Sequence, residues 1–295
     1  MASATSSRGS EACELAPLLA VGSVVEPVAH PKPGAVTRLL GQPDKDVVAF
    51  ALHSAAVTSA AVASCNASIE GLPDPILVGL RAYRRSLEAL GVRVNVGLGQ
   101  AMMIIPLSAA LARSGKDVRG IASTATGIVL SSSPEAAAEY YEILRLLSPS
   151  HLGAYRGPLP DVIGGRPTVG LGQLLRAVRW DLVASELTNG YPLTLRAVAD
   201  ISSRGGVSEE SVVAALADVL IEAGDTLIAR RWGVRAFLAS RAEVLTYVSE
   251  LGPGRAMALL DPLWRARGWS PGAALDIIAA AVGLYLVSRA LARLS

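Results

Sequence analysis

The segment His30-Pro31-Lys32-Pro33-Gly34 has the least ordinary composition in the sequence. Its prolines hold the backbone around Lys32 extended and rigid, and Gly34 allows a tight turn or the close approach of a ligand. Lys32 is one of three lysines in a chain that otherwise uses arginine. A stiffly presented ammonium, followed by Arg38, suits a chain of phosphates. A plain proline-rich connector would fit the same residues.

The segment Asn95-Val96-Gly97-Leu98-Gly99 is a second candidate for ligand binding. It could open a helix and offer free backbone N–H groups to an anion. It imitates part of a dinucleotide fingerprint, but Met102 replaces the third glycine and no strand–helix–strand unit surrounds it, which excludes that interpretation. Glycines that let helices pack closely are the alternative explanation.

Polar side chains also recur at helical spacing. Asp181, Ser185 and Asn189 would share one helical face, with Glu186 beside Asn189. A solvated helix face would produce the same pattern.

A row of carboxylates follows at Asp218, Glu222 and Asp225. These charges repel one another unless cations meet them, so metal ions, or Arg230 and Arg231, are the expected partners. A solvated acidic stripe would also explain the row.

Asp276 stands out because its helical neighbours are all small, namely Gly272, Ala273, Ala279, Ala280 and Gly283. Such a smooth face indicates that another helix or a ligand approaches closely. A buried carboxylate paired with arginine is the plainer interpretation.

Helices must position these residues. Hydrophobic residues make up 51% of the 295-residue chain and aromatic residues only 4%, which favours close helix packing over sheets. Ser133-Pro134-Glu135, Ser208 and Ser270-Pro271 are typical helix starts. We therefore predict an all-α fold in which residues 11–295 form a single domain after a frayed tail at residues 1–10. Helices are predicted at residues 11–25, 46–64, 75–90, 97–113, 116–128, 134–147, 171–189, 193–203, from 208, 226–250, 254–267 and 271–294.

Composition also limits the partners. A net charge of +2 provides no basic field for nucleic acid. The uncharged run at residues 94–112 contains polar residues and Pro106, so we interpret it as a buried core helix and expect no membrane association. Cys13 and Cys65 suggest neither a disulfide framework nor a metal site. With no signal peptide in evidence, we expect a cytoplasmic protein.

Taken in order, these motifs resemble the triphosphoribosyl-dephospho-CoA synthase family, in its archaeal-type branch. The matching stretches are Glu26 and residues 31–34 with Arg38, residues 95–99, residues 181–186 with residues 189–191, residues 225–233, and residues 271–276. The resemblance implies an all-helical transferase that moves the 5-triphosphoribosyl group of ATP to a ribose hydroxyl of 3′-dephospho-CoA, or of a related acceptor, and releases adenine. A non-catalytic helical nucleotide-binding or regulatory protein is the alternative.

The resemblance also assigns roles. Lys32, Arg38 and Arg230 would bind phosphates and Asn95 the ribose, while Gly34, Asn189 and Arg231 complete the nucleotide-binding set. Glu186, Asp225 and Asp276 are the catalytic candidates, and Glu222 and Asp225 the candidate ligands for Mg²⁺ that accompanies ATP. We expect Lys32, Asn95, Glu186, Asp225 and Asp276 to converge on one central pocket. A homo-oligomer is compatible with the sequence.

The chain departs from the family pattern at polar positions. Asn95-Val96-Gly97 stands where the family has Asn-Thr-His or Asn-Thr-Asn, and residues 43–46 do not preserve the family's usual His-x-Asp. Thr37 replaces an acid, and Ser270 replaces an asparagine. These changes touch groups expected to face substrate, so the acceptor could differ.

Overall fold

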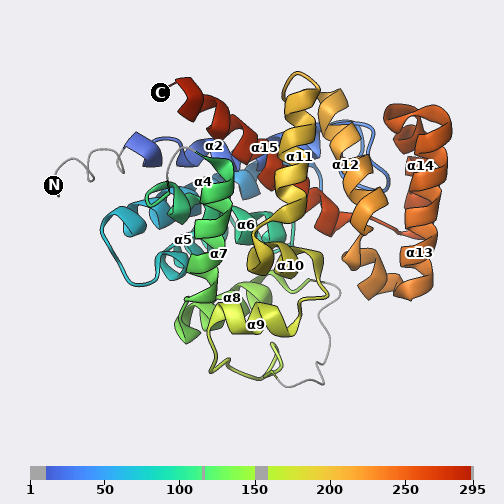
Figure 1. Ribbon diagram of the computed structural model, residues 1–295. Coiled ribbons are helices and arrows are strands. Elements are labelled where there is room, and N and C mark those ends of the chain that lie inside the picture. Colours follow the sequence, from blue (N-terminus) through green and yellow to red (C-terminus); the bar gives the residue numbers. More distant parts are fainter. Residues whose placement is uncertain (1–10, 115–116, 150–158, 294–295) are drawn as a thin grey trace.

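The computed structural model describes residues 11–114, 117–149 and 159–293, and this part of the chain is helical without strands (Figure 1). The predicted all-α class is confirmed. The predicted tail lies outside the described residues. The helices are α2 (Ala16–Ala20), α3 (Gly22–Val28), α4 (Val47–Ile69), α5 (Pro75–Ala89), α6 (Leu98–Leu111), α7 (Val118–Leu130), α8 (Pro134–Leu147), α9 (Leu171–Ala177), α10 (Leu182–Asn189), α11 (Pro192–Ser203), α12 (Glu209–Ala223), α13 (Thr226–Leu251), α14 (Pro253–Arg267) and α15 (Gly272–Arg293).

Helix starts follow the predicted capping chemistry. The Ser133 hydroxyl accepts a hydrogen bond from the backbone N–H of Ala136, with Pro134 at the first helical position. Ser208 and Ser211 form a reciprocal capping box at the start of α12. Local sequence therefore sets where these helices begin.

Helix α15 runs through the middle of the bundle, where it packs against α2, α3, α6, α11 and α12 (Figure 1). The crossing is close because Gly22 lies against the backbone of Ala279, and Gly283 lies against the backbone of Leu19. A side chain at either glycine would push the helices apart. One hydrophobic cluster extends from Cys13 to Leu291.

Three predicted helices differ from the structure. The predicted helix at residues 171–189 is broken between α9 and α10, because the Asp181 carboxylate accepts from the backbone N–H of Ala184 and starts a new helix. The predicted helix at residues 11–25 is broken by turns at residues 14–15 and at residue 21, and its last segment, α3, reaches Val28, so that Glu26 is helical. Gly233, with φ of 85°, kinks α13.

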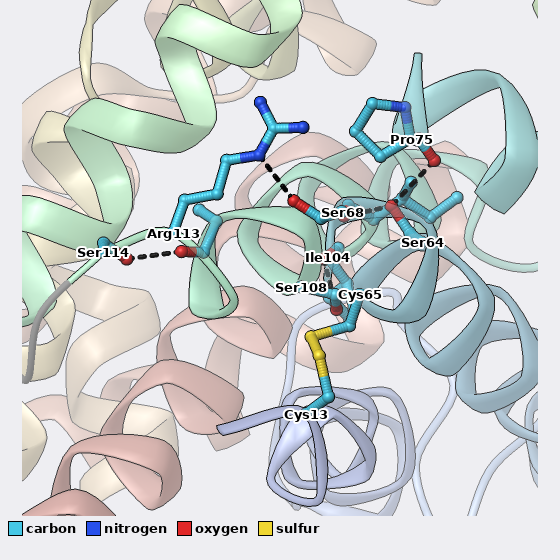
Figure 2. The surroundings of a disulfide bond; sticks show 11 residues. Cys13, Ser64, Cys65, Ser68, Pro75, Ile104, Ser108, Arg113 and Ser114 are labelled. Atoms are coloured by element: carbon cyan, nitrogen blue, oxygen red, sulfur yellow. Dashed lines mark hydrogen bonds between the residues drawn. A yellow bond between two sulfur atoms is a disulfide. The ribbon is translucent and has the colours of Figure 1, made fainter. Parts of the chain in front are cut away.

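Cys13 and Cys65 form a disulfide that ties the chain before α2 to the buried side of α4 (Figure 2). Their Cα atoms are 5.7 Å apart. The prediction that the two cysteines form no disulfide framework is therefore wrong. Helix α2 packs on α4, and this contact brings together two cysteines that are 52 positions apart.

Two helices, α4 and α15, are long and apolar enough to cross a bilayer by length and composition alone. Of their apolar windows, 44% and 67% respectively are buried inside the bundle. Core helices of large proteins meet the same criterion, so the predicted lack of membrane association stays a prediction.

Candidate functional site

A cavity of about 400 Å³ opens between the N-terminal quarter of the chain and helices α6, α8, α9, α10, α13 and α15. Its lining separates into a polar and an apolar part. The polar part comprises Glu26, Gln42, Lys45, Asn95, Gln100, Asp181, Arg230, Ser270 and Asp276. The apolar part includes Met102, Leu144, Leu159, Val162, Leu174, Leu175, Val178 and Leu187, with Tyr140, Tyr141 and Trp180. Such a cavity can hold a ligand with one charged end and one apolar end.

Two cations reach the polar part. The Lys45 ammonium donates to the carbonyl oxygen of Asn95 at 3.2 Å. Burial lowers the pKa of Lys45, and the nearby Asp44 and Asp276 raise it. Arg230 donates to Asp181 at 2.5 Å, and its guanidinium lies 5.1 Å from the centre of the Trp180 ring. Both cations therefore stand beside carboxylates at the cavity surface.

Two carboxyls, Glu26 and Asp276, belong to the cavity lining, and their surroundings differ. Glu26 is buried, forms an ion pair with Lys32 and accepts from Gln100 Nε2 at 3.0 Å. Asp276 is half-buried and packs against Gly99, with no hydrogen bond from any described residue. Burial raises the pKa of Asp276 well above its usual range, and the neighbouring Glu26, Asp225 and Asp181 raise it further. The cavity thus contrasts a carboxylate held by an ion pair and a hydrogen bond with a carboxyl that no hydrogen bond holds and whose charge the nearby Lys45 only partly offsets.

Four helices begin at the polar part. The cavity lining includes residues from the first turns of α6, α10, α13 and α15, such as Leu98, Val183, Leu227 and Ala273. The N-terminus of a helix carries a partial positive charge and free backbone N–H groups, so it favours anions. Side-chain caps already bind several of these N–H groups, namely those of Leu98, Ala184, Leu227, Ile228 and Ala274, so the four starts offer the cavity mainly their partial positive charge.

The junction between the two parts carries aromatic side chains. Trp180 is 56% exposed at the rim of the cavity. No hydrogen bond from the described residues reaches the hydroxyl of Tyr140, which is half-buried in the lining. A flat heterocycle could stack on Trp180 and receive a hydrogen bond from Tyr140.

Of the five residues expected to converge, Asn95 and Asp276 line the cavity. Arg230, which the resemblance assigned to phosphates, lines it as well. The Asn95 side chain also accepts from the backbone N–H of Leu98 at 3.1 Å, which fixes the turn that begins α6. The predicted close approach to Asp276 is made by helix α6 through Gly99.

Lys32, Glu186 and Asp225 lie behind the wall and do not line the cavity. Lys32 is buried, and its ammonium donates to the Glu26 carboxylate and carbonyl, so the expectation of a freely presented cation is wrong. Glu186 accepts from the backbone N–H groups of Leu193 and Thr194 at 3.0 and 2.8 Å and so caps α11.

Asp225 is also a buried cap. Its carboxylate accepts from the backbone N–H groups of Leu227, Ile228 and Ala274 and joins the starts of α13 and α15. The predicted acidic row does not exist as one face, because α12 ends at Ala223 and the chain turns at Gly224. Glu222 instead pairs with Arg196 on the surface. The placement therefore contradicts the prediction that Glu222 and Asp225 share a metal ion.

The remaining predicted residues lie elsewhere. Arg38 pairs with Glu209 at the surface, and the Asn189 side chain bonds Ser185 on its own helix. Arg231 lies over the Trp232 ring and does not line the cavity. Gly34 has a φ of 64° and donates to Asp261 at 2.8 Å, which fixes the loop after Lys32.

Sequence reasoning missed Glu26, Lys45, Tyr140, Trp180 and Asp181 as members of the cavity lining. Lys45 is as rare in type as Lys32, and Glu26 and Asp181 belong to the matched motifs, so a signal existed for these three. Tyr140 and Trp180 carry no motif. Only the packing of α8 and α10 reveals them.

Comparison with known families identifies the family of the chain. The family model CitG, ATP:dephospho-CoA triphosphoribosyl transferase, matches residues 13–294. The protein is thus a transferase that uses a nucleotide. More particularly, the chain belongs to the ATP:dephospho-CoA triphosphoribosyl transferase family and transfers the triphosphoribosyl group of ATP to dephospho-CoA or a related acceptor.

The fold has a solved relative. A crystal structure from Archaeoglobus fulgidus, described as a candidate triphosphoribosyl-dephospho-CoA synthase, is 20% identical, with a TM-score of 0.63 over 81% of this chain and 97% of that one. At this identity the likeness establishes the fold alone. A search of curated proteins returned no match.

Proposed function

We propose that ATP binds with its triphosphate among the starts of α6, α10, α13 and α15, and that the acceptor enters from the apolar part of the cavity. The convergence of these four helix starts carries the proposal, because the partial positive charge of a helix N-terminus favours a polyanion. Lys45 and Arg230 then supply mobile positive charge beside the phosphates.

Mg²⁺ fits the same end of the cavity. Among the described residues no group of three His, Cys, Asp or Glu side chains could hold a metal alone. Mg²⁺ with a nucleotide needs only one or two carboxylates besides the phosphates. Asp276 and Asp181, both in the lining, would hold it. A bound cation would neutralise phosphate charge and relieve the repulsion that raises the pKa of Asp276.

The transfer breaks the bond between C1′ and adenine and forms a bond from C1′ to the acceptor hydroxyl oxygen. The sugar passes through a state with oxocarbenium character, by analogy with glycoside chemistry. Glu26, which is bound by Lys32 and Gln100, takes the proton of the acceptor hydroxyl. Adenine stacks on Trp180 and accepts a hydrogen bond from Tyr140 as it leaves. Adenine takes its proton from water, and Glu26 returns the proton of the acceptor hydroxyl to water, so the transfer is balanced.

The apolar part fits the acceptor's arm. The aliphatic side chains of α8, α9 and α10 there offer surface without charge, next to the polar half that holds the reacting ribose. The loop at residues 159–165 is held in place because Tyr141 donates to the Pro160 carbonyl at 2.8 Å and Arg145 donates to the Val162 carbonyl at 2.7 Å. A fixed apolar wall of this kind is suited to bind the arm of an elongated acceptor and not to bind water molecules.

Two adjacent arginines provide the test. Arg230→Gln removes a cation from the cavity, whereas Arg231→Gln removes one beside it. We expect Arg230→Gln to raise the KM for ATP about tenfold or more, as for the loss of one charge-assisted hydrogen bond, with Arg231→Gln near wild type. Adenine release is followed by chromatography with dephospho-CoA as acceptor, after melting temperatures show that both variants are folded. Equal KM values for the two variants would contradict this placement of ATP.

A further inference from the structure

A line of buried polar side chains runs from the cavity into the bundle. Lys32 and Gln100 both bind Glu26, and at the far end the Tyr83 hydroxyl lies 3.0 Å from His53 Nδ1. All five side chains are buried and come from α3, α4, α5, α6 and the loop after α3. Five polar groups at such depth need a reason, since burial of unpaired polar atoms is costly.

The line is interrupted at one place. His53 Nε2 and Gln100 Oε1 are buried, and neither atom makes a hydrogen bond of full geometry. A Cβ atom on Gly97 would lie 2.7 Å from His53 Nε2 and 2.9 Å from Gln100 Oε1, so both atoms lie against Gly97, and the Gln100 side chain acts on the His53 imidazole. The φ of Gly97 is −166°, which any residue can adopt. Glycine is therefore needed at position 97 for space and not for backbone conformation.

Only one assignment of protons satisfies the whole line. Glu26 accepts with both oxygens, from Lys32 and from Gln100 Nε2, so Gln100 turns its NH₂ group toward Glu26 and its oxygen toward His53. His53 can donate to that oxygen only if Nε2 carries the proton, and Nδ1 then accepts from the Tyr83 hydroxyl. Burial lowers the pKa of His53 to about 4, so the imidazole is neutral and its tautomer is what matters.

We propose that Tyr83 and His53 are positioning residues for the transfer: by fixing the orientation of the Gln100 amide, they hold the Glu26 carboxylate toward the acceptor hydroxyl. The inference rests on the proposed role of Glu26 as base. Without the Tyr83 hydroxyl, His53 can place its proton on Nδ1, and Gln100 is then free to turn its oxygen toward Glu26, which repels that carboxylate.

The first test compares two buried tyrosines. Tyr83→Phe removes the hydroxyl at the far end of the line. Tyr191→Phe instead removes a hydroxyl that donates to the carbonyl of Met103, which lies on α6, the helix that also carries Gln100. We expect Tyr83→Phe to lower kcat about tenfold, within the range of general-base catalysis, and to leave the KM for ATP within about twofold of wild type. Tyr191→Phe should keep the wild-type kcat once the folded fraction is matched. Equal kcat values for the two variants would overturn the inference.

The second test is rescue at position 53. His53→Gln keeps an N–H donor near Nε2, whereas His53→Leu has none. We expect His53→Gln to retain kcat within about threefold of wild type and His53→Leu to lose about tenfold or more. If both variants lose kcat equally, the donor is not what matters and the inference fails.

A spectroscopic readout separates this inference from the function on which it rests. With ¹⁵N-labelled histidine, the chain gives signals from only three imidazoles, and His53→Gln assigns the one from His53. We expect the Nε2–H tautomer in the wild type and a mixture in Tyr83→Phe. If Glu26→Gln keeps wild-type activity, the base assignment fails, whatever the tautomer. If Glu26→Gln is inactive but the His53 tautomer is the same in wild type and Tyr83→Phe, the positioning inference alone is overturned.

Discussion

Asp276 and Asp225 are two carboxyls of the same neighbourhood whose pKa values are both raised, yet their partners differ. Asp276 has no hydrogen bond from any described residue, whereas three backbone N–H groups bind Asp225. Burial raises the pKa of Asp225 to about 6 against the lowering effect of these bonds. At the residue scale, the same substitution should therefore have opposite effects at the two positions.

We predict that Asp276→Asn stabilises the protein above neutral pH. The native carboxyl keeps its proton to a higher pH than the unfolded one, so the wild type loses stability as the pH rises from about 4 through the native pKa. An amide removes this loss. Melting temperatures should coincide near pH 4 and differ by roughly 2–4 °C at pH 8, with the variant higher. A lower melting temperature for the variant at pH 8 would mean that Asp276 has an anchoring role.

We predict that Asp225→Asn destabilises the protein. The two carboxylate oxygens accept from three N–H groups, and an amide would turn its NH₂ against one of them. Leaving a buried donor unpaired costs about 1–3 kcal/mol, which urea denaturation at pH 7 measures. Unchanged stability, together with weaker Mg²⁺-dependent ATP binding, would instead restore the metal role that the sequence predicted.

At the scale of single residues, the sequence motifs predicted the position of the site better than they predicted the role of each residue in it. Asn95, Arg230 and Asp276 reach the cavity, because they stand at helix starts whose position the sequence predicts. Lys32 does not, since Glu26 withdraws its ammonium into the core, and Lys45 reaches the cavity instead. Which of two rare lysines is buried depends on a tertiary ion pair that no local pattern encodes. The absence of a polar side chain at Gly97 was expected to alter a group that faces substrate, although His53 from another helix lies against that position.

At the scale of elements, a side chain of α10 caps the start of α11 across the turn that connects the two helices. Glu186 near the end of α10 binds the first N–H groups of α11, and the Thr194 hydroxyl donates to the same carboxylate at 2.7 Å. Asn189 was expected to bind nucleotide, but it lies at the end of α10, where its side chain bonds Ser185. The break at residues 178–181 escaped prediction because Leu174, Leu175 and Leu182 continue a helical spacing through it.

We expect Glu186→Ala to lower the free energy of unfolding by about 1–3 kcal/mol, because it leaves two buried N–H groups unpaired. The control is Glu88→Ala, which breaks an exposed i,i+4 pair with Arg84 and should cost about 0.5 kcal/mol or less. Chemical denaturation gives both values. Adenine release per folded molecule should stay at the wild-type rate, and a selective loss of kcat in Glu186→Ala would return Glu186 to the catalytic set.

On the scale of the whole molecule, the disulfide closes a loop of 52 positions that contains Glu26, Lys32 and Lys45. In the chain-entropy account, such a cross-link stabilises the native state by up to about 4 kcal/mol. We predict that Cys13→Ser with Cys65→Ser lowers the urea midpoint accordingly, and that reductant lowers the midpoint of the wild type but not of the variant. A wild type insensitive to reductant would show that α2 is secured by packing alone.

The central position of α15 has a consequence for synthesis. Residues 272–276 supply one wall of the cavity, and the remainder of α15 fills the space between α2, α3 and α11. Emerging from the ribosome, the first helices therefore have no partner for the Gly22 crossing until more than two hundred further residues have followed. Because such distant contacts form late and leave apolar surface uncovered meanwhile, a chain stalled before α15 should be bound by chaperones or proteases rather than accumulate as a partly active enzyme.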